Sequence, residues 1–226
     1  MTPNPGGAYP VLVAGPHAAI EAVLGSRLAE VNEQSIARLV STRVRETSNF
    51  DFKESLYGRS DSDKRDLATD ISAMANAAGG VILLGVRDED GAAIDLTPVQ
   101  LSEEEEQRIR LVVASNVAPP PAFTIHRVES SPATGFYLLA IPSSPWKPHA
   151  VIVNKALRYP RRFGADTVYL SESEVADAYR NRYRMAEQQI ARTRLIHTEA
   201  LPFVDLRNDA WLAISVVPNS AGHLAL

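Results

Sequence analysis

The stretch Glu46-Thr47-Ser48-Asn49-Phe50-Asp51-Phe52-Lys53 decides the fold. Its second half alternates apolar and polar residues, which is the period of a half-buried β-strand. Both phenylalanines are expected to point inward, so Asp51 and Lys53 share the opposite face. Glu46 lies five residues before Asp51. The stretch therefore predicts a strand that carries an acid and a lysine on one face, with a second acid just before it.

A helix and a buried strand are predicted to follow. Residues 64–78 have the apolar spacing of a helix, and Gly79-Gly80 is expected to end it, because glycine accepts the left-handed conformation after a helix C-terminus. Residues 81–86 are apolar on both faces, which is typical of a central strand. This strand delivers Asp88 into a turn that precedes Gly91. Glu46, Asp51, Lys53 and Asp88 can thus meet at one site, although they come from separate elements.

The remaining patterns complete a prediction for the whole chain. Further helices are expected in residues 18–45, from Ser102 to about 117 and from Ser171 to about 194, and strands in residues 93–96, 122–128, 135–141 and 156–163. The fold class is then α/β (α+β), a mixed β-sheet flanked by helices, with an N-terminal helical lead and a C-terminal helix. We expect a flexible leader in residues 1–17, one domain in residues 18–194, and a tail or the start of a further element in residues 195–226.

The composition excludes several function classes. The chain has 226 residues, 45% of them apolar, and a net charge of −4, so the whole molecule is not a basic nucleic-acid binder. It has no cysteine, which excludes disulfides, thiolate zinc sites and cysteine nucleophiles. No stretch approaches the ~20 apolar residues of a membrane span, and the N-terminus lacks the pattern of a signal peptide. We expect a cytoplasmic protein with no membrane partner.

The motif order resembles the AlbA_2 domain of the Schlafen-like family, which is found in bacterial proteins and in vertebrate Schlafens. The family pattern is a glutamate, four residues and an acid-Phe-Lys strand, then a helix with Ala-Asn-x-x-Gly-Gly and a strand ending Gly-Val-x-Asp. The matching residues here are Glu46, Asp51-Phe52-Lys53, Ala75-Asn76-Ala77-Ala78-Gly79-Gly80 and Gly85-Val86-Arg87-Asp88. The resemblance covers roughly residues 30–184.

The resemblance implies a catalytic site. Some Schlafens are metal-dependent endoribonucleases that act on tRNA and rRNA, and their three catalytic acids fall by position on Glu46, Asp51 and Asp88. The family's second acid is usually glutamate, so Asp51 is one methylene shorter. Carboxylates that hold Mg²⁺ or Mn²⁺ can activate a water and neutralise phosphate charge. Lys53 beside them can stabilise the transition state of phosphodiester cleavage.

The same four residues have a structural interpretation. Lys53 would then pair with Asp51 or Glu46, and Asp88 would cap the turn before Gly91. In that case the acids form a salt-bridge network and hold no metal.

A second group of residues is basic and aromatic. Basic residues interleaved with aromatic ones suit a phosphate backbone with unstacked bases. The candidate nucleic-acid-binding residues are Lys155, Arg158, Tyr159, Arg161 and Arg162. Their alternative role is a solvated surface with charge pairs to Asp166, Glu172 and Glu174.

These features define three candidate functions. The first is a Schlafen-like nucleic-acid-binding protein that acts as a metal-dependent endoribonuclease on tRNA or other structured RNA, with RNA favoured and DNA as the other nucleic acid. The second is a non-catalytic DNA-binding or transcriptional regulatory module. The third is a nucleotide-binding sensor, although no Gly-x4-Gly-Lys-[Ser/Thr] phosphate loop is present. A homodimer is left open as the assembly.

Overall fold

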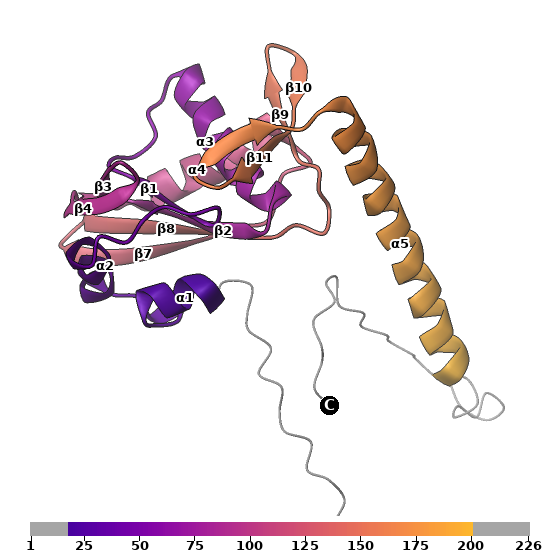
Figure 1. The fold of residues 1–226 in the computed structure, drawn as a ribbon, viewed down its shortest axis with the longest axis horizontal. Helices are drawn as coiled ribbons and strands as arrows, with labels where there is room; N and C mark the ends of the chain where they lie inside the picture. The colour runs from indigo at the N-terminus through magenta and orange to yellow at the C-terminus, as the bar shows by residue number, and fades with distance from the viewer. Residues whose placement is uncertain (1–17, 201–226) are drawn as a thin grey trace, which may run out of the picture. The chain divides into compact units, whose positions relative to one another are not determined.

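The computed structural model describes residues 18–200. The helices are α1 (Ala18–Leu24), the short 3₁₀ helix η1 (Leu28–Glu30), α2 (Glu33–Ser41), α3 (Asp61–Asn76), α4 (Glu103–Asn116) and α5 (Glu172–Ala200). The strands are β1 (Phe50–Lys53), β2 (Gly79–Leu84), β3 (Val86–Glu89), β4 (Ala92–Leu96), β5 (Val99–Gln100), β6 (Val117–Ala118), β7 (Thr124–Ser131), β8 (Thr134–Pro142), β9 (Ala150–Val153), β10 (Ala156–Arg158), β11 (Pro160–Phe163) and β12 (Asp166–Tyr169). The predicted α/β class, with a mixed sheet flanked by helices, is confirmed (Figure 1).

The chain divides into two compact units. One unit is Pro16–Tyr183, and the other joins Met1–Gly15 with Arg184–Leu226. The expected leader at residues 1–17 lies outside the described residues, as does the expected tail beyond residue 200. No helix within residues 18–200 is long and apolar enough to cross a membrane.

The main sheet is mixed, and β2 lies at its centre. β1 runs parallel to β2 with Asp51 opposite Ile82, whereas β8 runs antiparallel on the other side of β2. β8 also pairs with β7 and, at its start, with β5. The parallel β1–β2 pair needs a crossover connection, and α3 supplies it.

Helices cover both faces of this sheet, so it is the middle layer of three (Figure 1). Val81 and Leu83 of β2 pack with α1, α2 and the two phenylalanines of β1. Ile82 and Leu84 point the other way, toward α3 and α4. Asp51 is on the α3 face because it alternates with the phenylalanines. The face of β1 that carries Asp51 was predicted to be half-exposed. It is instead covered by α3.

Gly79 and Gly80 do not end the helix as predicted. α3 stops at Asn76, and the two glycines are the first residues of β2. Gly79 has φ +82°, and a Cβ there would lie 2.5 Å from the Ser143 nitrogen. A Cβ on Gly80 would lie 2.7 Å from the Asn49 carbonyl oxygen. Close approach of neighbouring backbone, rather than helix capping, requires glycine here.

Two hairpins occupy the region predicted as one strand at 156–163. β10 pairs with β9, and β11 pairs with β12, with a break at Tyr159 between them. Both hairpins pack against α3. Pro160, the first residue of β11, follows the break.

Asn76 at the end of α3 fastens these hairpins. It is 6% exposed. Its amide nitrogen donates to the carbonyl oxygens of His149 (2.9 Å) and Pro160 (2.7 Å). Its amide oxygen accepts from the His149 nitrogen at 2.7 Å. The asparagine of the Ala-Asn-x-x-Gly-Gly motif thus connects α3 to both hairpins.

We expect Asn76→Ala to lower the free energy of unfolding by about 3 kcal/mol, because it leaves buried backbone groups without partners. Urea denaturation measures the loss. Asn116→Ala is the control, since Asn116 donates only to Val112 of its own helix. Equal losses in the two variants would contradict the assigned role of Asn76.

Candidate functional site

Asp51 lies between two cations beneath α3. It is 2% exposed, and its Oδ1 accepts from Nη2 of Arg162 at 2.6 Å. Nζ of Lys53 is 2.6 Å from Oδ2. Arg162 is itself only 8% exposed. The pair joins β1 to β11 across 111 residues of sequence.

Lys53 has a second carboxylate partner in Asp70 of α3. Its Nζ is 3.7 Å from Asp70 Oδ2, which also accepts from the Tyr57 hydroxyl at 2.6 Å. Burial acts to lower the pKa of Lys53, but the charges of Asp51 and Asp70 outweigh it, so the pKa is raised. Burial raises the pKa of Asp70, an effect that Lys53 partly offsets. The lysine therefore stays charged between two acids.

Glu46 bridges β1 and the β3–β4 turn. Its backbone nitrogen donates to the Gly91 carbonyl at 2.7 Å, and its Oε1 accepts from the Phe52 nitrogen at 2.8 Å. Burial raises the pKa of Glu46; the Phe52 amide opposes this, while the charges of Asp51 and Asp88 add to it. Glu46 is thus within electrostatic reach of both other acids.

Asp88 lies on exposed β3 and holds the turn. Its Oδ2 accepts from the Gly91 nitrogen at 3.1 Å. Gly91 therefore contacts both Asp88 and Glu46. The structural interpretation predicted this capping bond and the Lys53–Asp51 pair, and the structure contains both.

The three acids do not form a ready ligand set. Within residues 18–200, no three His, Cys, Asp or Glu side chains are grouped as a metal site requires. Both Asp51 oxygens already face a cation at 2.6 Å, a space that Mg²⁺ or Mn²⁺ would have to share. Asp51 is held by ion pairs, whereas Glu46 and Asp88 accept hydrogen bonds from backbone nitrogens.

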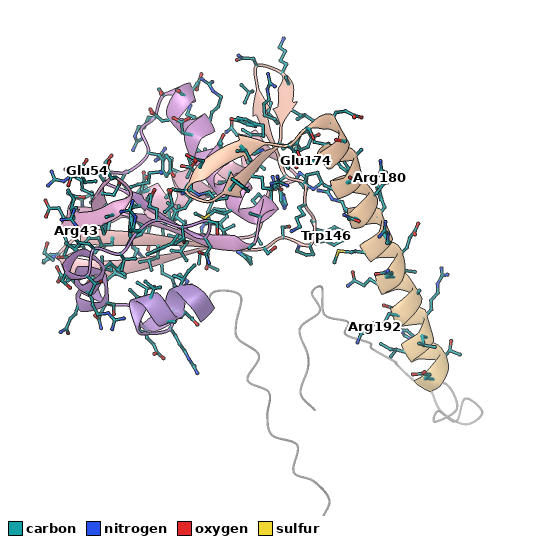
Figure 2. The ribbon with its side chains drawn as sticks, in the orientation of Figure 1. Arg43, Glu54, Trp146, Glu174, Arg180 and Arg192 are labelled. Atoms are coloured by element: carbon teal, nitrogen blue, oxygen red, sulfur yellow. The ribbon has the colours of Figure 1, made fainter. Side chains whose placement is uncertain are left out.

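The five predicted nucleic-acid-binding residues fall into distinct environments. Lys155, in the β9–β10 turn, and Arg158, at the end of β10, are exposed and form no ion pair within the described part of the chain. Arg161 pairs with Glu174, labelled at the start of α5 in Figure 2, at 2.9 Å. Arg162 is buried on Asp51.

Tyr159 is half-buried against Tyr179 of α5. The rings meet edge to face with centroids 6.3 Å apart, and the hydroxyl oxygens are 3.4 Å apart. Burial, and then the Tyr179 hydroxyl, raise the pKa of Tyr159 to about 12. Arg182 lies over the Tyr179 ring, 5.1 Å from its centroid, and donates to the Lys147 and Pro148 carbonyls. These contacts fix the first half of α5 within the unit Pro16–Tyr183.

Sequence reasoning missed Asp70 and Tyr57. Asp70 follows Leu67 by three residues and precedes Met74 by four, so it belongs to the apolar stripe of α3. An acid on that stripe was the available signal, because a buried carboxylate requires a partner. Nothing local distinguishes Tyr57 from a surface tyrosine.

We expect Asp51→Asn to lower the free energy of unfolding by about 3–5 kcal/mol, because it leaves Arg162 buried without its counter-charge. Arg162→Met should cost a similar amount, and the double variant less than the sum, which a urea double-mutant cycle measures. Arg161→Met, which breaks a half-exposed pair, should cost under about 1 kcal/mol. Similar costs for Arg161→Met and Arg162→Met would show that the Asp51–Arg162 pair has no special weight.

Comparison with solved structures gives the crystal structure of the DIP2311 protein from Corynebacterium diphtheriae as a similar chain. The identity is 16%, the TM-score is 0.42, and the match covers 71% of this chain. The chain spans 30% of the length of that protein. No curated protein matches the chain.

The family comparison matches the region that contains the charge network. The model described as "Schlafen, AlbA_2" matches residues 46–170, which begin at Glu46 and end just after β12. This match spans more than half of the 226 residues. The chain therefore belongs to the Schlafen AlbA_2 family.

Proposed function

We propose that this protein binds nucleic acid, with RNA preferred, through the hairpins β9–β10 and β11–β12. Membership of the Schlafen AlbA_2 family indicates a nucleic-acid-related function. The observation that carries the proposal is the exposure of Lys155 and Arg158, neither of which forms an ion pair among the described residues. The preference for RNA rests on the resemblance to endoribonuclease Schlafens.

Unpaired cations matter in a chain with a net charge of −4. The other arginines on the described strands form ion pairs. Arg87 pairs with Asp95, and Arg127 pairs with Glu106. A phosphate approaching Lys155 or Arg158 need not displace a carboxylate. Its binding would release counterions, which favours association at low salt.

The buried pair Asp51–Arg162 would contribute to binding by holding the hairpins in place. Arg162 anchors β11 to Asp51, and Asn76 bonds both β11 and the residue before β9. The hairpins are therefore held at two points before any ligand arrives. Preorganised groups lose less entropy on binding than mobile ones do.

Replacing both unpaired cations should weaken RNA binding and flatten its salt dependence. For Lys155→Ala/Arg158→Ala we expect the slope of log affinity against log salt to fall by about 1.5, as two phosphate contacts would give. Fluorescence anisotropy between about 50 and about 200 mM salt, with an RNA of roughly 20 nucleotides, measures the slope.

The matched control removes two cations from another part of the same unit. Arg43, labelled in Figure 2, pairs with Glu89, and Arg87 pairs with Asp95. Arg43→Ala/Arg87→Ala should leave the slope within experimental error. If the wild-type protein binds neither RNA nor DNA at low salt, the proposed function is wrong. A matching DNA oligonucleotide decides which nucleic acid is preferred.

Metal-dependent RNA cleavage stays a prediction, and one observation favours it over pure binding. Glu46 and Asp88 both bond to Gly91, and Glu46 also accepts from Phe52, which lies between Asp51 and Lys53 on β1. The ion pairs of Asp51 argue for the non-catalytic alternative. Activity would require the carboxylates to gain a ligand geometry that they lack here.

An assay of tRNA cleavage with Mn²⁺ or Mg²⁺ decides between the endoribonuclease and the non-catalytic module. If the chain is an endoribonuclease, cleavage should require the metal and fall at least about 100-fold in Asp88→Asn, as the loss of a ligand or charge stabiliser predicts. Asp95→Asn is the control, because Asp95 is an exposed acid on the partner strand β4. An RNA-binding protein that cuts with neither metal is the non-catalytic module.

A further inference from the structure

Large apolar side chains are exposed on both hairpins that the proposed function uses. Phe163, at the end of β11, is 68% exposed, the largest exposed fraction among the large exposed apolar side chains of the described residues. Tyr169 of β12 is 56% exposed, and the cross-strand pair Leu157 and Ile152 of the other hairpin is also exposed. Tyr169 pairs with Pro160 and so lies on the other face of its hairpin, which leaves Phe163 as the exposed large apolar side chain on the face that carries Arg161.

Strand alternation places Phe163 on the outer face of its hairpin. Pro160 and Arg162 share the inner face, where both are buried. Arg161 and Phe163 share the outer face, about 7 Å apart along the strand. A guanidinium and a phenyl ring therefore stand side by side on the exposed face.

The charge opposite Phe163 indicates which part of a nucleotide fits there. Asp166 is its cross-strand partner and is exposed. A carboxylate repels phosphate but accepts hydrogen bonds from the amino groups of a base. Arg161 lies on the same face and is half-exposed, but its pair with Glu174 at 2.9 Å means that a phosphate there would share it with that carboxylate. The group over Phe163 is accordingly a base.

The strand that carries the ring is also anchored. Arg162, the preceding residue, is tied to Asp51 at 2.6 Å. Gly164 follows with φ +60°, and a Cβ there would meet nothing within 4 Å, so no atoms crowd the turn after Phe163. A base on Phe163 would lie next to the strand whose Arg162 reaches the Glu46–Asp51–Lys53 network.

We propose that Phe163 is a stacking platform for an unpaired base, and that the chain prefers single-stranded nucleic acid or unpaired loops over duplex. This inference rests on the proposed nucleic-acid binding and names the class of its ligand. Bases in a duplex already stack on each other and cannot cover a protein ring, whereas every unpaired base offers a free face.

The test compares Phe163→Leu with wild type on a single-stranded RNA and on a duplex of the same composition. Leucine keeps an apolar side chain but removes the aromatic face. We expect single-strand affinity to fall about 5- to 100-fold and duplex affinity to change less than about twofold, as the loss of one stacked base predicts. Phe163→Trp should restore single-strand binding and show fluorescence quenching on binding. Leu111→Ala, on an exposed apolar residue of α4, should change neither affinity.

The outcomes separate this inference from the proposed function. Binding with the wild-type preference in Phe163→Leu would overturn the stacking platform and leave nucleic-acid binding intact. Equal loss on both RNAs, or loss of self-association by light scattering, would assign Phe163 to a general or protein contact and also overturn it. No binding by wild type would overturn both proposals.

Discussion

A carboxylate buried between two cations is the constraint on which this structure depends. Asp51 pairs with Arg162 and Lys53 at the same time, and the three groups come from β1 and β11. Removing such groups from water costs several kcal/mol per ion, which close pairing must offset. The geometry therefore has little freedom. The hairpin β11–β12 must lie where Arg162 meets Asp51, and α3 must cover them.

The network holds more negative than positive charge. Glu46, Asp51 and Asp70 stand against Lys53 and Arg162, which leaves one negative charge in excess if all five are ionised. The raised pKa values of Glu46 and Asp70 reflect burial together with this imbalance. A partly buried site with surplus negative charge attracts cations in general. The surplus is the physical feature that keeps metal binding worth testing, although the carboxylates are not arranged as ligands.

Local patterns predicted those parts of the fold that local physics determines. The alternation at 50–53 placed both phenylalanines in one core, and Ser171 and Glu174 cap the helix that was predicted to begin at Ser171. Gly79-Gly80 was misassigned because its cause is the approach of distant backbone at Ser143 and Asn49. The burial of Arg162 could not be predicted either, since its partner is 111 residues away. Tertiary contacts, not propensities, decide both cases.

In the basic and aromatic strand β11, neighbouring residues have different roles: one is buried in the structure and the next is exposed for contact. On a strand, neighbours face opposite sides, so Arg161 and Phe163 face outward while Arg162 faces Asp51. A sequence of this kind suggests one continuous basic patch, but the strand divides it into an anchor and a contact surface. The anchor is necessary because a short two-stranded hairpin has little stability of its own. Burying one arginine on Asp51 thus anchors the strand whose next residue, Phe163, is exposed.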